Sequence, residues 1–498
     1  MEATMDLAIW IIIIPLFVGF ACGVINHYKK KWLKPFVLSA GFIYFLVVLT
    51  HIIFRDQLPY VYNLGEWERL IAINLALDDF TLVMLILLSL IVLLVAIYSS
   101  TKIGKKKSAF FLLFNILVVG VSGMIMTSDL FNLYVFFEIT SISSYSLVAF
   151  RDDDFSIEAA YKYLIIGTIS GVFLLLAIVL TYQATGTLNM ALIPEKLDTV
   201  EPLVRHVLLS FYVIGLGVKF ALVPLHTWLP DAYVGVPIAY NVLSSGLVIK
   251  ACFFALMRII YIFFGVEFLQ TFSLDIIISY WGAVTIIFGH SVAFRQSNVK
   301  RIMGYSTIAQ MGYIMVAFGL GTAAGIVAGS FHLINHAVMK STIFFASGNL
   351  AKVSGGYELE DLRGVGGVMP KTSLLFVMIL LALVGLPPFN GFISKWMILQ
   401  ASADAGFYFP ALMVIVGSVI SLGYYLGIIR AIFTAPDVEI DGLDIPKFSL
   451  TEEVPPFLLG SICVITGIIP MIILNLIDGA PQFLLERANY ITMILGGG

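Results

Sequence analysis

Charged residues are scarce in this sequence. They make up 12% of its 498 residues, against 60% hydrophobic residues, and the mean hydropathy is +1.00. So apolar a composition excludes an ordinary soluble domain and gives no support to nucleic-acid binding, which requires a basic surface. Cysteine is rare as well: Cys22, Cys252 and Cys463 lie inside hydrophobic runs, without a second Cys or a His at ligand spacing. We therefore expect no disulfide, metal site or iron–sulfur cofactor.

The sequence also lacks the features of a nucleotide-binding protein. No glycine-rich phosphate loop follows a strand, and no polar stretch is long enough to form a domain that holds a nucleotide or another cofactor. ATP-driven pumping by this chain alone is therefore disfavoured, and whether the chain belongs to an enzyme is left open. The acidic segment 1–6 precedes the first hydrophobic run without a basic region, which argues against a cleaved secretory signal.

What the sequence contains instead is a series of long hydrophobic runs. A bilayer core of about 30 Å requires about 20 apolar residues in a helix. Read at this length, the chain is predicted to be an all-α polytopic membrane protein with about fourteen transmembrane helices. These helices are expected at residues 7–26, 33–54, 79–100, 108–127, 129–150, 162–182, 206–223, 239–261, 274–294, 301–320, 325–348, 371–400, 409–433 and 455–476.

Basic residues are distributed unequally between the two sides of this topology. The positive-inside rule assigns the side with more Lys and Arg to the cytoplasm, so both termini are expected outside. The poorer side has Arg55, Arg69, Lys196, Arg205 and Arg487. The richer side has Lys29, Lys30, Lys31, Lys34, Lys102, Lys105, Lys106, Lys107, Arg151, Lys162, Arg295, Lys300, Arg301, Lys352, Arg363, Lys371, Arg430 and Lys447.

A few charged side chains lie inside the predicted helices. Each costs about 2.5–3.5 kcal/mol at the bilayer centre on insertion scales, so a group of them indicates a function, most simply ion movement. One of them, Arg258, is close to the outer end of its helix and is expected to snorkel to the interface. The full set is Glu138, Lys219, Lys250, Arg258, Lys340 and Lys395.

Two predicted helices are interrupted by proline. The seventh contains VKFALVPLHTWLPDAY, and the twelfth contains LVGLPPFNGFISKW. Proline removes an amide donor and clashes with the preceding turn, so each helix is expected to open into two halves that line a polar cavity. A Lys beside a broken helix in each half of the chain is typical of transporters with internal repeats, although prolines can also simply kink helices. The interrupting residues are Pro224 and Pro230 after Lys219, and Pro387, Pro388 and Gly391 before Lys395.

The buried acid Glu138 requires a cationic partner to stay ionised at membrane depth. Lys219 is the expected partner. If the pair can open and close, it is a switch, because the released lysine can pass its proton on. A static structural ion pair is the alternative.

One predicted helix carries His332, His336 and Lys340 at a spacing of four residues, which places them on one helical face. Imidazole changes charge near neutral pH, so this face is interpreted as a proton wire. Zinc binding by the two His is disfavoured, because no acid or Cys ligand is near and a cation follows. Lys250 is expected to link this face to the broken seventh helix.

Several motifs together resemble the antiporter-like subunits of Mrp-type sodium/proton antiporters, respiratory complex I and membrane-bound hydrogenases. They are VKFALVPLHTWLPDAY, QSNVKRIMGYSTIAQMGYI, HLINHAVMK and GLPPFNGFISKW, spread over about residues 80 to 430. FNLYVFFEITSISSYSLV and YNLGEWERL are most similar to the D-type subunit of Mrp antiporters, or to its equivalent in archaeal hydrogenase and sulfur-reductase complexes. The family often has His where this chain has Tyr233, so a titrating role there is not expected.

The resemblance implies two inverted five-helix repeats, each with a broken helix. It divides the chain into 1–107 (helices 1–3), 108–261 (first repeat), 274–433 (second repeat) and 434–498 (the last helix and tail). It also implies a proton path along Glu138, Lys219, Lys250, His332, His336 and Lys395.

The same resemblance implies partners and a location. The expected partners are other membrane subunits of one complex, the lipid bilayer, protons, Na⁺ and a redox module. The expected location is a prokaryotic cell membrane. Three functions remain open: a proton-translocating subunit of an Mrp-type Na⁺/H⁺ antiporter; the pump module of a ferredoxin-driven hydrogenase, sulfur reductase or complex I-like oxidoreductase; and a scaffold with vestigial charges.

Overall fold

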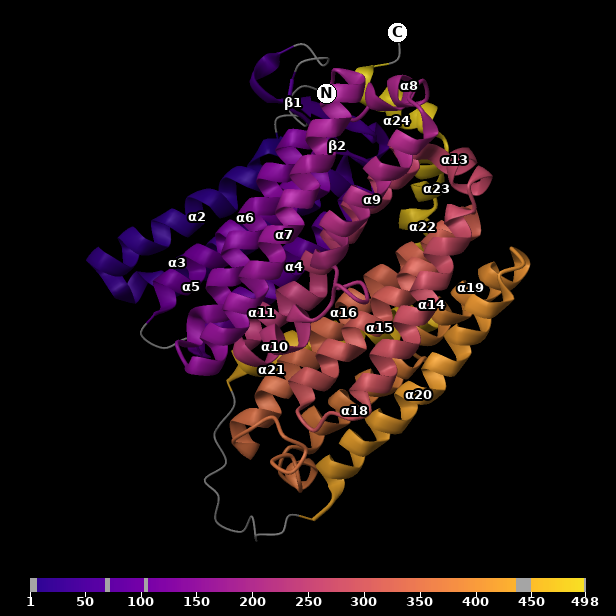
Figure 1. The fold of residues 1–498 in the computed structure, drawn as a ribbon. Helices are drawn as coiled ribbons and strands as arrows, with labels where there is room; N and C mark the ends of the chain where they lie inside the picture. The colour runs from indigo at the N-terminus through magenta and orange to yellow at the C-terminus, as the bar shows by residue number, and fades with distance from the viewer. Residues whose placement is uncertain (1–6, 68–71, 103–105, 436–448, 497–498) are drawn as a thin grey trace.

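The structure, a computed structural model, describes residues 7–67, 72–102, 106–435 and 449–496. Helices dominate this part of the chain, and its single sheet has two strands. Expectations for the segment 1–6, and for the basic residues Arg69, Lys105 and Lys447, fall outside the described residues. The long helices run side by side through the molecule, and both chain termini lie at the same end (Figure 1).

Ten described segments are long and apolar enough to cross a membrane. One of them, Leu7–Ile53, consists of the two helices α2 (Leu7–Lys29) and α3 (Leu33–Ile53). The predicted spans that are not among the ten coincide with α15, α16 and the broken pair α18 and α19, whose bounds are given below. The all-α polytopic membrane class is therefore confirmed, and a helix occupies the position of each predicted span.

The first half of the chain forms the bundle on the left of Figure 1. A capping box at Asp153 starts its longest helix, which ends before Gly186, whose φ of 68° suits glycine. Its helices are α4 (Asp79–Lys102), α5 (Lys107–Met126), α6 (Leu130–Val148), α7 (Asp154–Thr185), α8 (Ile193–Leu197), α9 (Pro202–Lys219) and α10 (Trp228–Gly235).

A continuous helical segment, 238–271, crosses the interior between the two halves. It contains two π-helical stretches, which are rare and often lie at functional sites. The apolar stretch of this segment is entirely buried within the protein. Its parts are α11 (Ile238–Leu243), η5 (Ser244–Val248), α12 (Ile249–Arg258), η6 (Ile259–Phe264) and α13 (Gly265–Thr271).

The second half is built around α16 (Ala323–Ser354), which is buried from Gly325 to Leu350 except at the partly buried Val327. It packs against α15, α18, α19 and α21. The remaining helices of this half are α14 (Leu274–Ala293), α15 (Val299–Gly319), α17 (Val365–Val368), α18 (Pro370–Val384), α19 (Asn390–Asp404) and α20 (Tyr408–Phe433).

Short elements cover the end of the molecule at which the termini lie (Figure 1). Strands β1 (Tyr60–Asn63) and β2 (Asn74–Leu77) pair antiparallel, with Tyr60 opposite Leu77. C-terminal helix α24 packs against β1.

The C-terminal helices are α21 (Leu450–Ile468), α22 (Met471–Ile477), α23 (Ala480–Leu485) and α24 (Arg487–Leu495). Single 3₁₀ turns are η1 (Lys30–Trp32), η2 (Arg55–Gln57), η3 (Leu64–Glu66) and η4 (Ala149–Arg151).

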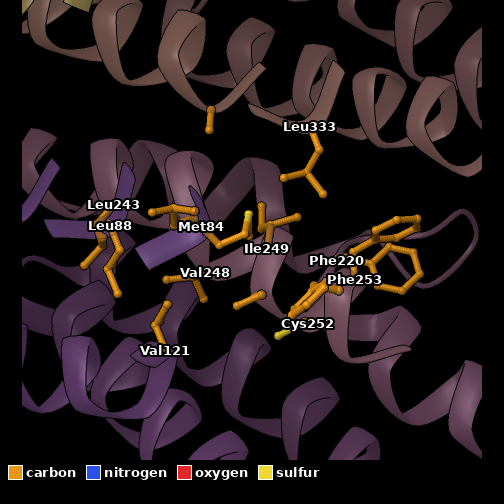
Figure 2. Close-up of a cluster of buried hydrophobic side chains, with 14 of the residues drawn as sticks. Met84, Leu88, Val121, Phe220, Leu243, Val248, Ile249, Cys252, Phe253 and Leu333 are labelled. Carbon is orange, nitrogen blue, oxygen red and sulfur yellow. The ribbon is translucent and has the colours of Figure 1, made fainter. Parts of the chain in front are cut away.

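Apolar side chains fill the space around the central segment (Figure 2). Met84 of α4 and Leu333 of α16 are fully buried, and Val248 is 2% exposed. The rings of Phe220 and Phe253 meet edge to face with centroids 5.3 Å apart. An unpaired polar group costs several kcal/mol in such an environment, so the polar side chains described next require hydrogen-bond partners.

Candidate functional site: a buried polar axis

Lys219 is the last residue of α9 and is 2% exposed. Its Nζ donates a hydrogen bond to the Tyr145 hydroxyl, at 2.9 Å. The ammonium also lies over three aromatic rings, 5.3 Å from Phe137, 4.5 Å from Tyr145 and 4.6 Å from Tyr163. Cation–π attraction at a desolvated site contributes about 2 kcal/mol or more. Lys219 is therefore held by an aromatic cage.

Glu138 of α6 is partly buried, and its carboxylate lies against Gly171 of α7, where a Cβ would be only 2.4 Å from Oε1. Among the described residues, Glu138 forms no ion pair with Lys219 within 4.0 Å, although the two are close enough for a Coulombic interaction. The expected pair is therefore separated in this structure. Lys219 is held by the aromatic cage instead of by Glu138, and we did not predict this cage.

The first helix break lies between α9 and α10, as expected from Pro224. Two indole groups satisfy backbone carbonyls there: Trp228 donates to Val218 at 2.7 Å, and Trp281 donates to Val223 at 2.6 Å. Pro230 does not interrupt a helix. It lies in the first turn of α10, where the missing amide proton is not needed.

Lys250 follows the π-helix η5 and is completely buried. Its Nζ donates to the Ser245 carbonyl, one of the groups in the widened turn. The π turn presses against α16, since a Cβ on Gly246 would be 2.7 Å from the Ser341 hydroxyl oxygen. Lys250 is close enough to interact electrostatically with His336 and Lys340, and its role as a link between the two halves stays a prediction. No direct hydrogen bond among the described residues joins it to Lys219.

His332 and His336 of α16 are both completely buried, with parallel rings 6.1 Å apart. His332 is well partnered: Nδ1 lies 2.8 Å from Ser394 Oγ and Nε2 lies 2.9 Å from Gln310 Oε1. Neither ring nitrogen of His336 has a hydrogen-bond partner in the described part of the protein. The two His share a helical face, but no hydrogen bond between described residues continues from one ring to the other.

Lys340 lies one turn further along α16 and is also completely buried. Its Nζ donates to the Met303 carbonyl at 3.0 Å and to Ser306 Oγ at 2.8 Å. Both acceptors belong to α15. Lys340, like His332, is therefore bound to α15.

Lys395 lies beside the second helix break, between α18 and α19, and is 5% exposed. Its Nζ donates to the carbonyls of Leu383 and Val384, at 2.9 and 3.1 Å, and to Ser418 Oγ at 3.2 Å. The break therefore frees carbonyls, as expected, and the lysine binds them. Gly391 does not interrupt the helix: it lies in the first turn of α19.

Arg258 was expected at the interface, but it is 4% exposed and bound inside the protein. Its guanidinium donates to the carbonyls of Ile125 and Thr127, to Ser128 Oγ at 3.2 Å and to the Tyr490 hydroxyl at 2.8 Å. Snorkelling is therefore wrong, because α24 covers the end of the helix. The physical reason is tertiary packing between residues 232 positions apart in sequence, which hydropathy does not register.

Sequence reasoning missed three buried or partly buried polar residues: Tyr145, His290 and Lys300. Tyr145 lies in an aromatic-rich helix, and the only feature of the sequence that could have singled it out is its position seven residues after Glu138. His290 stands alone in α14, and the signal that could have found it is an ionisable residue at the depth of a predicted span. Lys300 was counted as a loop residue, but it is 2% exposed and donates to the Val236 carbonyl at 2.8 Å.

The fold and this buried axis define a class: a polytopic membrane protein with lysine and histidine side chains at membrane depth. The family model described as NADH:quinone oxidoreductase/Mrp antiporter, transmembrane, matches residues 127–421. The chain belongs to this family, and the resemblance inferred from its motifs is confirmed.

Individual relatives cover nearly the whole chain. The N subunit of the NADH-quinone oxidoreductase of Desulforudis audaxviator is 33% identical over 91% of this chain and 90% of its own. The D subunit of the Na(+)/H(+) antiporter of Alkalihalophilus pseudofirmus is 29% identical over 83% of this chain and 84% of its own. A chain of the membrane-bound sulfane sulfur reductase, an archaeal respiratory membrane complex, superposes with a TM-score of 0.91 at 33% identity, covering 98% and 99%.

Proposed function

We propose that this chain is the proton-translocating subunit of a multisubunit complex in a prokaryotic cell membrane. The observation that carries the proposal is a series of buried lysines without a carboxylate partner. In the described part of the protein, Lys219, Lys250, Lys340 and Lys395 form no ion pair within 4.0 Å and bind only hydroxyl, carbonyl or thioether groups. A buried lysine without an anionic partner gives up its proton more readily than an exposed one, which suits a proton carrier.

The proposed path runs from Glu138 through Lys219 and Lys250 to the side chains of α16 and on to Lys395. Transfer begins when Lys219 moves between its aromatic cage and Glu138. His332, His336 and Lys340 would carry the proton across the second half. The proposal includes two internal repeats, 108–261 and 274–433, each of which would supply one broken helix with an adjacent lysine. Residues 1–107 and 434–498 would form the flanking parts.

Proton flow would be coupled to Na⁺ exchange with the help of partner membrane subunits. Support for this comes from the likeness to the D subunit of the antiporter. The alternative is that the same chain is the pump module of a redox complex, and it is favoured by the likeness to the sulfur reductase chain. Purifying the native complex separates the two, since a redox complex carries iron–sulfur absorption and an antiporter complex does not.

The experiment that tests the proposal is Na⁺-dependent proton flux in vesicles that contain the whole complex. Lys219→Arg keeps the positive charge and the donors but cannot release a proton, because arginine stays protonated in proteins. We expect this variant, and Glu138→Ala, to assemble on a native gel and to lose most of the flux. Normal flux in both assembled variants would leave only the scaffold hypothesis.

A further inference from the structure

His290 of α14 is completely buried and lies between two tyrosines. Its Nδ1 is 3.0 Å from the Tyr424 hydroxyl and its Nε2 is 3.2 Å from the Tyr313 hydroxyl. Both ring nitrogens are thus in contact with a group that can either donate or accept a proton. The path proposed above does not use this histidine.

On one side, these contacts continue to Lys340. The Tyr424 and Tyr425 rings are 4.3 Å apart between centroids, and no direct hydrogen bond joins their hydroxyls in the described part of the protein. The Tyr425 hydroxyl lies 2.6 Å from Ser306 Oγ, and Ser306 accepts from Lys340 Nζ. Hydroxyl groups therefore lie along the way from Lys340 to His290, and the step between Tyr425 and Tyr424 requires a small movement of their side chains.

On the other side, the contacts continue to Lys395. Ser418 Oγ accepts from Lys395 Nζ at 3.2 Å, and no direct hydrogen bond between described residues joins it to the Tyr313 hydroxyl. Lys395 also lies over the Tyr313 ring, 4.3 Å from its centroid. Gly417 permits this crowding, since a Cβ there would be 2.7 Å from the Tyr313 hydroxyl and 3.2 Å from the His290 ring. The chain of groups thus reaches the second broken helix.

We propose that this series, through α14, α15 and α20, is a proton branch joining Lys340 to Lys395 with His290 as its central relay residue. It rests on the proton translocation proposed above and adds a route to it. The direct route along α16 passes His336, whose ring nitrogens have no hydrogen-bond partner among the described residues. The branch has two steps without a direct hydrogen bond among the described residues, between the Tyr424 and Tyr425 hydroxyls and between Tyr313 and Ser418, but both ring nitrogens of its histidine are partnered.

The transfer balances when Lys340 starts as an ammonium and Lys395 as a neutral amine. Lys340 gives an N–H proton to Ser306, and each hydroxyl takes a proton on one side as it releases its own on the other. Neutral His290 gains a proton at Nδ1 and loses one at Nε2, which exchanges its tautomer without a net charge. Lys395 accepts the last proton through Ser418. Before the next transfer the hydroxyl groups rotate back, His290 returns to its Nε2–H tautomer, Lys340 is reprotonated and Lys395 releases its proton.

The branch is tested by proton flux in vesicles with the whole complex. Tyr424→Phe removes one hydroxyl, and His290→Gln keeps a donor and an acceptor but cannot exchange protons. We expect each variant to assemble and to lose flux by about tenfold or more. Tyr44→Phe is the matched control, since the Tyr44 hydroxyl is also buried against a serine, 3.0 Å from Ser122 Oγ; it should retain full flux. Ser418→Ala is a third variant should either of the others fail to assemble.

Wild-type flux in Tyr424→Phe and His290→Gln, together with loss of flux in Lys395→Arg, would overturn the branch and leave the proposed function standing. Wild-type flux in Lys395→Arg and Lys219→Arg as well would overturn the proposed function, and the branch with it. Equal loss of flux in Tyr44→Phe and Tyr424→Phe would also overturn the branch, because the effect would then be structural.

Discussion

At the scale of single residues, Lys395 has two roles: it binds the carbonyls freed at the helix break, and in the proposed path it carries a proton. Its ammonium has three N–H donors, and they match three acceptors: the carbonyls of Leu383 and Val384 and the Ser418 hydroxyl. After loss of a proton, two donors suffice for the carbonyls, and the nitrogen lone pair can accept from Ser418. The lysine can therefore change protonation state without leaving the helix break.

Replacing Lys395 separates the two roles. Lys395→Met leaves two buried carbonyls without a donor, at a cost of about 1–3 kcal/mol each, so the complex should melt at a lower temperature. Lys395→Arg keeps donors at the break and should restore most of the thermal stability, but not proton flux. The measurement is thermal unfolding of the purified complex alongside vesicle flux. Equal stability of Lys395→Met and wild type would show that the break does not depend on this side chain.

Tyr145 is predicted to position Lys219. In Tyr145→Phe the ring remains but the acceptor at 2.9 Å is lost, and a hydrogen bond to a charged group contributes about 1.5–3 kcal/mol. Lys219 should then favour Glu138, and proton flux should fall several-fold. Vesicle flux measures this, with Tyr212→Phe as control, since the Tyr212 hydroxyl is bound to Thr181 at 2.8 Å away from the axis. Unchanged flux in Tyr145→Phe would contradict a positioning role.

Sequence reasoning reached the residues of the axis but not their partners. Lys219, Lys250 and Lys340 stand out because a charge in a hydrophobic run is unusual in composition alone. Hydroxyl groups such as Tyr145 are common in membrane helices and give no such signal. Their role depends on which helix lies opposite, which one sequence does not reveal.

At the scale of elements, hydropathy predicted the helices well, because lipid requires every spanning segment to satisfy its own backbone. Prolines located both helix breaks. The π turns of η5 and η6 could not be predicted, since each depends on a contact with another helix, as between Gly246 and Ser341. The two inverted repeats remain a prediction.

The broken pair α18 and α19 depends on a close backbone approach. A Cβ on Gly391 would lie 1.8 Å from the Ala382 carbonyl oxygen, and backbone cannot yield as a side chain does. Gly391→Ala should therefore destabilise the complex by about 1–3 kcal/mol or prevent assembly. Gly427→Ala in α20 is the matched control, because no described atom lies within 4 Å of its Cβ position. Native gels and thermal unfolding measure both, and equal behaviour of the two variants would refute the close packing.

At the scale of the whole molecule, the distribution of basic residues predicts that both termini lie outside. The three native cysteines are all buried, so thiol labelling at the surface has little background. A Cys at exposed Arg295 should be protected from an impermeant maleimide added to intact cells, whereas a Cys at exposed Glu201 should react. The reverse pattern would place the termini inside.

The contact between Arg258 and Tyr490 has a consequence for synthesis of the chain. The two residues are 232 positions apart, and chains are made from the N-terminus. The buried guanidinium of Arg258 therefore lacks its partner Tyr490 until the ribosome has added α24. The interior of the protein is therefore completed late in translation. A nascent chain released before α24 would leave the Arg258 guanidinium in the membrane without one of its hydrogen-bond partners.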